Sequence, residues 1–233
     1  MKTPHLLLCN DDGIYAPGIM ALYEAVRDLG TVSIVAPETE RSAVGHAITL
    51  SDPIKIKRVR RNGAFAGYAV AGTPADCVKL AVTVLLKRRP DLVISGINLG
   101  PNTGISVIYS GTVSAATEGA ILGIPSVALS LATFTDPHWD TARHVARRLV
   151  GALLARRLPR RLLLNVNVPN RPRERLRGIA VTRMGRSRFA EIFHRRTTPR
   201  GDTYYWMDGE LQRTGPAGGT DTRALEYGRV AVT

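Results

Sequence analysis

Cysteine and long hydrophobic runs are both scarce in this sequence. Its 233 residues include only two cysteines, Cys9 and Cys77, too few for a disulfide framework and, by themselves, for a zinc site. No apolar stretch approaches the roughly 18 residues of a membrane-spanning helix, and the first apolar run is too short for a signal peptide. We therefore expect a soluble, cytoplasmic, globular protein with no membrane partner and with both cysteines in its core.

Several glycine motifs are also missing. The sequence has no G-x-x-x-x-G-K-[ST], which argues against a Walker-type NTPase, and no G-x-G-x-x-G in the turn after its first predicted strand, which argues against a dinucleotide dehydrogenase. A G-x-S-x-G nucleophile elbow is absent as well. Any phosphate or nucleotide chemistry must therefore come from another arrangement of residues.

Positive charge is plentiful but uneven. The net charge is +13, and residues 134–233 hold 20 Lys and Arg against 9 Asp and Glu, while residues 1–133 are nearly balanced. One interpretation is a surface that attracts an anionic partner such as a nucleotide, polyphosphate or nucleic acid. The other is a set of solvated helix faces and turns. We favour the second, because the arginines are spread along the chain instead of forming one block.

Strand-like and helix-like segments alternate through the first two-thirds of the chain. The pattern predicts strands over residues 5–9, 31–36, 91–94, 124–130 and 162–168, and helices over 17–28, 73–89, 112–122 and 140–155. Such alternation is typical of an α/β protein with a mostly parallel, Rossmann-like sheet flanked by helices. We expect residues 1–170 to form the catalytic core. Residues 171–233, with short pieces such as 203–207 and 229–233, should form a C-terminal β-hairpin or arm outside the sheet.

Adjacent carboxylates follow the first predicted strand, in the segment Asn10-Asp11-Asp12-Gly13. Two neighbouring carboxylates repel each other, and a cation between them would offset that cost. Oxygen ligands of this kind suit Mg²⁺, Mn²⁺ or Ca²⁺. The same four residues are also ordinary turn chemistry, so on its own this segment leaves both interpretations open.

The segments after the next two strands are polar as well. Residues 37–49 offer Arg41 and Ser42 for phosphate or metal, and His46 as a tentative proton shuttle. We predict a long glycine-rich loop over 95–111 leading into a helix, which is a typical anion site because backbone N–H groups and the helix dipole point at the ligand. Asn98 in this loop could give a neutral oxygen to a metal.

Six segments, in order, resemble the SurE family, the survival-protein nucleotidases. They are residues 10–18 (NDDGIYAPG), 36–49 (APETERSAVGHAIT), 72–77 (GTPADC), 90–119 (PDLVISGINLGPNTGISVIYSGTVSAATEG), 123–130 (GIPSVALS) and 165–169 (NVNVP). The resemblance covers about the first 170 residues. Residues 219–233 also look like the family's C-terminal stretch, although in relatives that stretch usually continues through a Pro-Leu.

The resemblance implies a metal-dependent phosphatase with specific site residues. It implies metal ligands at Asp11, Asp12, Ser42 and Asn98, with Asp11, Asp12 and Asn98 as the catalytic group. It implies substrate-phosphate contacts at Asn102, Ser110 and Thr112. It also implies one divalent cation per subunit, Mg²⁺ or Mn²⁺, and a C-terminal arm exchanged between subunits in a homodimer or homotetramer.

The expected function is therefore hydrolysis of nucleoside 5′-monophosphates, with 3′-monophosphates and short polyphosphate as further candidate substrates. The cation would act as a Lewis acid. An aspartyl-phosphate formed on Asp11 ranks second, because adjacent carboxylates differ from the spaced D-x-D of that chemistry. Two alternatives of another class are a basic nucleic-acid-binding protein, disfavoured by sparse aromatics, and a metal-dependent nucleotide sensor without turnover.

Overall fold

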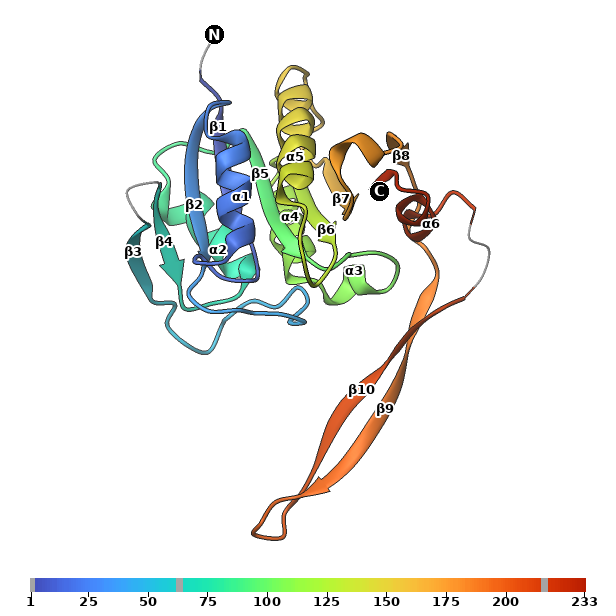
Figure 1. Cartoon of the computed structure of the whole chain (residues 1–233). Coiled ribbons are helices and arrows are strands. Elements are labelled where there is room, and N and C mark those ends of the chain that lie inside the picture. Colours follow the sequence, from blue (N-terminus) through green and yellow to red (C-terminus); the bar gives the residue numbers. More distant parts are fainter. Residues whose placement is uncertain (1–2, 62–64, 215–217) are drawn as a thin grey trace.

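A single mixed sheet runs through most of the chain. In the computed structural model, which describes residues 3–61, 65–214 and 218–233, the sheet has the strand order β3-β4-β2-β1-β5-β6-β7-β11-β8 (Figure 1). Its parallel centre consists of β4 (Phe65–Val70), β2 (Thr31–Pro37), β1 (His5–Cys9), β5 (Leu92–Leu99), β6 (Ser126–Ala132) and β7 (Leu163–Pro169). The expected α/β class with a mostly parallel sheet is confirmed.

Helices cover both faces of this sheet. On one face α1 (Pro17–Val26) packs beside α5 (Trp139–Leu154), and on the other α2 (Pro74–Leu80) packs beside α4 (Gly111–Ile121). Five residues in π-helical conformation, Ala81–Leu85, continue α2, and a short α3 (Ser106–Tyr109) precedes α4. The chain thus has three layers, and the six strands of the parallel centre all end at the same edge of the sheet.

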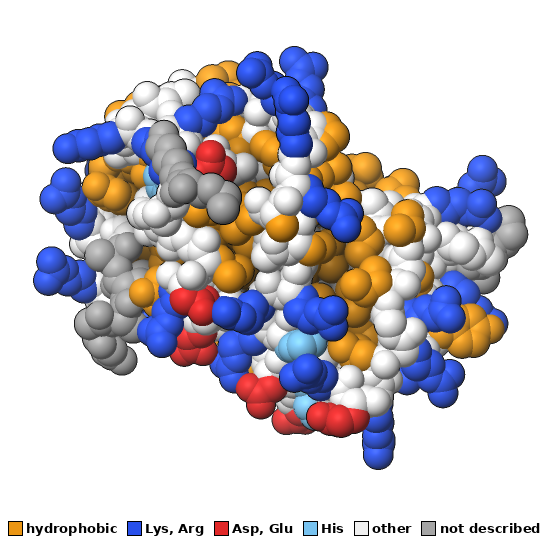
Figure 2. Space-filling model, turned by 90° about the horizontal axis from the view of Figure 1, so that it is seen from above, with side chains coloured by type: hydrophobic (Ala, Val, Ile, Leu, Met, Phe, Trp, Pro, Cys, Tyr) orange, Lys and Arg blue, Asp and Glu red, His pale blue; other side chains and the backbone are white. Residues whose placement is uncertain are grey.

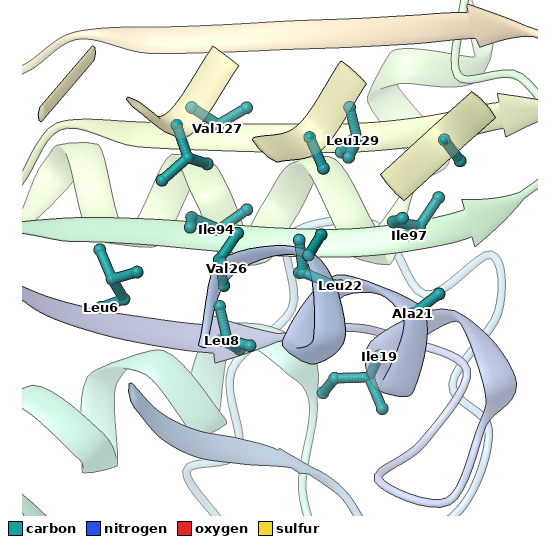
Figure 3. Packing of buried hydrophobic residues seen from close by; sticks show 14 of the residues in the cluster. Leu6, Leu8, Ile19, Ala21, Leu22, Val26, Ile94, Ile97, Val127 and Leu129 are labelled. Atoms are coloured by element: carbon teal, nitrogen blue, oxygen red, sulfur yellow. The ribbon is translucent and has the colours of Figure 1, made fainter. Parts of the chain in front are cut away.

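The alternation of side chains along β1 explains how one strand serves two cores. Leu6 and Leu8 join the cluster under α1 and α5, whereas Leu7 and Cys9 join the cluster under α2. Figure 3 shows the first of these clusters, where Leu22 and Val26 of α1 lie against the side chains of β1 and β5. Successive side chains of a strand point to opposite faces, so an uninterrupted apolar run is what a strand buried on both sides requires. Cys9 and Cys77 are both buried and free, as expected.

The start of α2 follows from its sequence. The Thr73 side chain accepts a hydrogen bond from the Asp76 backbone N–H, and the Asp76 carboxylate accepts one from the Thr73 N–H at 2.9 Å. This reciprocal capping box satisfies two backbone donors that the helix leaves free, and Pro74 occupies the first helical position. The helix predicted after residue 73 is confirmed.

Some expected elements were wrong. The segment predicted as a loop over 95–111 contains regular secondary structure, because β5 continues through Leu99 and α3 lies further along the segment. The segment 229–233, expected to lie outside the sheet, instead contributes β11 (Val230–Val232) antiparallel to β7, with β8 (Ile179–Val181) beside it. Two further strands, β3 (Ile56–Arg61) and β4, were not predicted. The sequence of β3 is rich in arginine, and Gly67 interrupts the apolar residues of β4.

A long antiparallel hairpin leaves the body of the protein. It is formed by β9 (Ser187–Thr197) and β10 (Thr203–Arg213) and projects far from the sheet (Figure 1). The expected C-terminal hairpin therefore exists, while its role in oligomerisation stays a prediction. The chain returns from it through α6 (Asp221–Glu226) to the sheet, and the turn Arg173–Arg175 lies before β8. No helix within the described ranges combines the length and apolarity that crossing a membrane requires.

Close packing of α1 on β5 yields a prediction about Gly18. A Cβ at Gly18 would lie 1.9 Å from the carbonyl oxygen of Ile97, which is backbone and cannot move aside easily. We expect Gly18→Ala to lower the free energy of unfolding by about 1–3 kcal/mol, despite the better helix propensity of alanine. Urea unfolding followed by circular dichroism would measure the change.

The matched control is Gly151→Ala in α5, where a Cβ would meet no atom within 4 Å. There the propensity of alanine acts alone and should raise stability by up to about 1 kcal/mol. Equal effects of the two substitutions would contradict the packing argument.

Candidate active site

Two aspartates stand at the carboxyl end of β1. Asp11 is 5% exposed and Asp12 is half-buried. The chain passes from β1 to β2 on one side, while β5 lies on the other, so Asp11 and Asp12 occupy the point where the strand order reverses. In open parallel sheets, ligands bind in the crevice formed there.

Segments distant in sequence converge on Asp11. The backbone N–H of Arg41, from the loop after β2, donates to the Asp11 carbonyl oxygen at 2.8 Å. The Thr112 hydroxyl, from the first turn of α4, donates to Asp11 Oδ1. Between them, a Cβ at Gly111 would lie 2.7 Å from the Asp11 Cβ, so only glycine allows this close approach. The structure therefore brings the predicted Asp11 and Thr112 into direct contact.

The electrostatics of the two carboxyl groups are unfavourable as they stand. Burial raises the pKa of Asp11, although the hydrogen bond from Thr112 opposes the shift. Burial, together with the charges of Asp11 and Glu40, raises the pKa of Asp12 to about 7. Within residues 3–61, 65–214 and 218–233, neither aspartate forms an ion pair with Lys, Arg or His. A bound cation would supply the missing positive charge and favour the ionised form of both groups.

The donor set around this point fits a hard divalent cation. Asn98 lies near the end of β5, next to β1, and its amide nitrogen donates to the Gly100 carbonyl at 2.8 Å, which leaves the side-chain oxygen as a possible ligand. Ser42 is exposed on the loop after β2, with its hydroxyl donating to Glu40 at 2.6 Å. No cluster of three or more His, Cys, Asp and Glu suited to a metal occurs in the described chain. A site here would combine two carboxylates with neutral oxygen donors, the chemistry of Mg²⁺ or Mn²⁺ rather than zinc.

The predicted phosphate residues lie around the start of α4. Ser110 is the N-cap of this helix, and its oxygen accepts from the Val113 N–H at 3.1 Å, which leaves its hydroxyl hydrogen available to a ligand. The Thr112 hydroxyl hydrogen is used on Asp11. The first-turn N–H groups of a helix bind anions readily, so the end of α4 next to Asp11 can receive a phosphate.

Asn102 is placed by a network that the sequence reasoning did not identify. Its amide nitrogen donates to Ser130 at 2.8 Å, and its backbone N–H donates to the Asn167 side chain at 2.8 Å. Its carbonyl oxygen accepts from Asn165 and Asn167. The asparagines of residues 165–169 (NVNVP) are thus the supports of the glycine-rich segment. The alternation of these asparagines with valine along an apolar strand was the sequence feature that could have indicated this role.

Other residues were missed because their partners are remote in sequence. Asp221, fully buried at the start of α6, accepts from the backbone N–H of Gly104 at 3.0 Å and of Gly185 at 2.8 Å. It therefore connects the segment after β5 with the base of the hairpin. Glu118 of α4 is also buried and contacts His46 and Lys79. Nothing local in the sequence indicates either connection.

Part of the excess positive charge lies away from this site. Arg156, Arg157, Arg160 and Arg161 are exposed in the connection that leads into β7, at the amino end of the strands. Figure 2 looks onto that end and shows Lys and Arg side chains dispersed around the surface. The two aspartates lie at the opposite end, so these four arginines are not part of the site.

Comparison with known proteins gives consistent matches. The family model described as "Survival protein SurE" matches residues 6–191. The chain is 50% identical to the 5′-nucleotidase SurE of Syntrophobacter fumaroxidans, covering 98% of this chain and 91% of that protein. It is also 50% identical to the 5′-nucleotidase SurE of Heliobacterium modesticaldum, covering 98% and 84%. The crystal structure of the SurE protein from Aquifex aeolicus superposes with a TM-score of 0.83 at 42% identity, covering 99% of this chain and 92% of that one.

The raised pKa of Asp12 predicts how stability depends on pH. A carboxyl group whose pKa rises from 3.8 to about 7 on folding contributes stability that is complete below about pH 4 and is lost as the pH rises through about 7. We therefore expect Asp12→Asn to stabilise the metal-free protein at pH 8, by up to about 4 kcal/mol, and to have little effect near pH 4.

Urea unfolding in EDTA at both pH values would measure this difference. The control is Asp52→Asn, at an exposed carboxylate, which should change stability equally at the two pH values. An Asp12→Asn protein that is less stable than the parent at pH 8 would contradict the proposed electrostatics.

Proposed function

The chain belongs to the SurE family and is a 5′-nucleotidase, and from that premise we propose that it hydrolyses nucleoside 5′-monophosphates with the help of one divalent cation. The observation that carries this proposal is the pair of carboxylates at the end of β1, which has no basic partner among the described residues. Beside it lies the N-terminus of α4, which suits a phosphate. A cation site and an anion site in contact are what a metal-assisted phosphatase needs.

The residues proposed to hold the cation are Asp11, Asp12, Ser42 and Asn98. When bound, Mg²⁺ or Mn²⁺ would supply Lewis acidity toward a phosphoryl oxygen. Asp11 is the best fixed of these ligands, because Thr112 holds one of its oxygens and the Arg41 N–H holds its backbone. Ser42 donates its hydroxyl hydrogen to Glu40, which leaves the lone pairs of its oxygen for a cation.

The phosphate is proposed to bind at the start of α4. The Ser110 hydroxyl, the remaining N–H of the Asn102 amide and the Gly111 N–H at the start of α4 would donate to its oxygens. Thr112 belongs to the same group of residues, although its hydroxyl serves Asp11 in this structure. Donors fixed in advance stabilise the charge that spreads over the equatorial oxygens as the phosphoryl group transfers.

In the reaction, the oxygen of a water molecule forms a bond to phosphorus while the ester bond to the nucleoside oxygen breaks. The leaving oxygen takes up a proton, and nucleoside and inorganic phosphate are released. Direct attack by water is favoured over an aspartyl-phosphate on Asp11, because Asp11 is buried and one of its oxygens already accepts from Thr112. His46 is held by Glu118, so no general base is assigned.

The finer features of this function are proposals of the same kind. We propose that 3′-monophosphates and short polyphosphate are further substrates. We also propose that the enzyme works in the cytoplasm as a homodimer or homotetramer through the C-terminal segment 171–233. Nucleic acid is not proposed as a partner, because aromatic side chains for base stacking make up only 6% of the sequence.

The test of the function is phosphate release from 5′- and 3′-nucleoside monophosphates, with EDTA or with added Mg²⁺ or Mn²⁺. We expect release only with metal, and a loss of about 100-fold or more in kcat/KM for Asp11→Asn, because the cation contributes several kcal/mol to the transition state. The matched control is Asp52→Asn, at an exposed carboxylate outside the hairpin, and it should keep full activity.

The outcome that would overturn the proposal is a folded protein that binds nucleotides with every metal tested and never releases phosphate. Undiminished release by Asp11→Asn would instead refute the assignment of the site.

A further inference from the structure

A buried carboxylate in α4 contacts both helix α2 and the loop after β2. The Glu118 side chain is 3% exposed, with one oxygen 2.6 Å from Lys79 Nζ of α2 and the other 2.9 Å from His46 Nε2. Burying a carboxylate is costly unless it is paired and hydrogen-bonded. Lys79 supplies a compensating charge, and His46 makes a separate contact with the other carboxylate oxygen.

That contact belongs to the loop that carries Ser42. Before Ser42, the loop is fixed by the hydrogen bond from the Arg41 N–H to the Asp11 carbonyl at 2.8 Å. After it, the loop is fixed by the Gly45 N–H, which donates to the Tyr109 carbonyl at 3.1 Å, and then by the His46 side chain on Glu118. The Ser42 side chain itself contacts only Glu40 among the described residues. Its position therefore depends on these two flanking attachments.

The backbone between the attachments needs such support. Ala43 has a φ of 55° and Gly45 a φ of 59°, and the left-handed region costs energy for a residue with a side chain. A conformation of this kind persists only where its surroundings hold it. His46 provides the side-chain anchor next to this turn, and further along Thr49 is held by Asp76 at 2.6 Å.

We propose that Glu118 is a positioning residue for the cation site, which it supports by holding His46 and thereby fixing the loop that presents Ser42 to Asp11 and Asp12. This inference rests on the proposed function, in which Ser42 is a ligand. Because Glu118 and Thr112 belong to the same helix, α4 aligns a carboxylate ligand through Thr112 and the hydroxyl ligand through Glu118. Groups that orient the ligands of a metal commonly affect its affinity by about 10–100-fold.

The experiment is calorimetric titration of the full-length, metal-free protein with Mn²⁺ alone. The variants are Glu118→Gln and His46→Ala, the second of which leaves the Glu118–Lys79 pair intact and the interior of α4 undisturbed. We expect each to weaken Mn²⁺ binding by about 10-fold. In a Ser42→Ala background we expect the same changes to have little further effect, because a residue that acts through Ser42 has nothing left to position.

The matched control is Lys79→Met, which removes the other partner of Glu118 and leaves the loop contact. It should lower the free energy of unfolding while changing Mn²⁺ affinity by less than about twofold. If Lys79→Met weakens Mn²⁺ binding as much as His46→Ala does, the effect comes from packing around Glu118 in general, and the proposal is overturned. Additive effects of His46→Ala and Ser42→Ala on Mn²⁺ binding would overturn it too.

Activity measurements separate the remaining explanations. If His46→Ala lowers kcat while Mn²⁺ binding stays at the parent level, His46 takes part in proton transfer and the positioning role is refuted. If the parent binds Mn²⁺, Asp11→Asn does not, and both test variants bind normally, the inference fails while the proposed function stands. If the parent protein binds no Mn²⁺ at all, the proposed cation site fails and the inference fails with it.

Discussion

The arrangement of this protein depends on two adjacent carboxylates placed at the end of a buried strand. Asp11 and Asp12 lie where charge is costly, with Glu40 as a further negative neighbour. Such a site is stable only if something compensates it: a proton, as the raised pKa of Asp12 indicates, or a cation. The surrounding structure supplies oxygen donors from other segments and, in the part of the chain that is described, no basic side chain. In the function proposed above, a bound metal ion would offset this electrostatic cost.

Close backbone approach is the second requirement of the site. Gly111 allows α4 to begin against Asp11, and Gly18 allows α1 to pack on the end of β5. At Gly96, where φ is 133°, a Cβ would lie 2.2 Å from the Leu129 carbonyl oxygen. These contacts draw the ends of β1 and β5 and the helix N-terminus into one small region. In the function proposed above, Ser110 and Thr112 would contact a phosphate bound in this region.

The C-terminal segment also contacts the sheet and the glycine-rich segment after β5. β11 extends the sheet next to β7, and Asp221 holds both Gly104 and Gly185 by their backbone N–H groups. The base of the long hairpin is thereby connected to the glycine-rich segment that carries Asn102. A change in the hairpin, such as contact with another subunit, would reach the substrate side of the site through a single buried carboxylate.

Local sequence patterns were enough to predict the parallel centre of the sheet. Apolar runs such as 5–9 and the capping residues Thr73 and Pro74 act locally, and the polar segments after the strands pointed to Asp11 and Asn98 as candidates. Ser110, the N-cap of α4, became a candidate only through the resemblance to the SurE family. The edge strands, the continuation of β5 to Leu99 and the return of residues 230–232 to the sheet depend on pairing between distant segments, which local patterns do not encode. For the same reason only the tertiary structure revealed Glu118 with His46, Asp221 with Gly104, and Asn167 with Asn102. Each is a buried polar group whose partner is set by the fold, because burial obliges it to find one wherever the chain brings it.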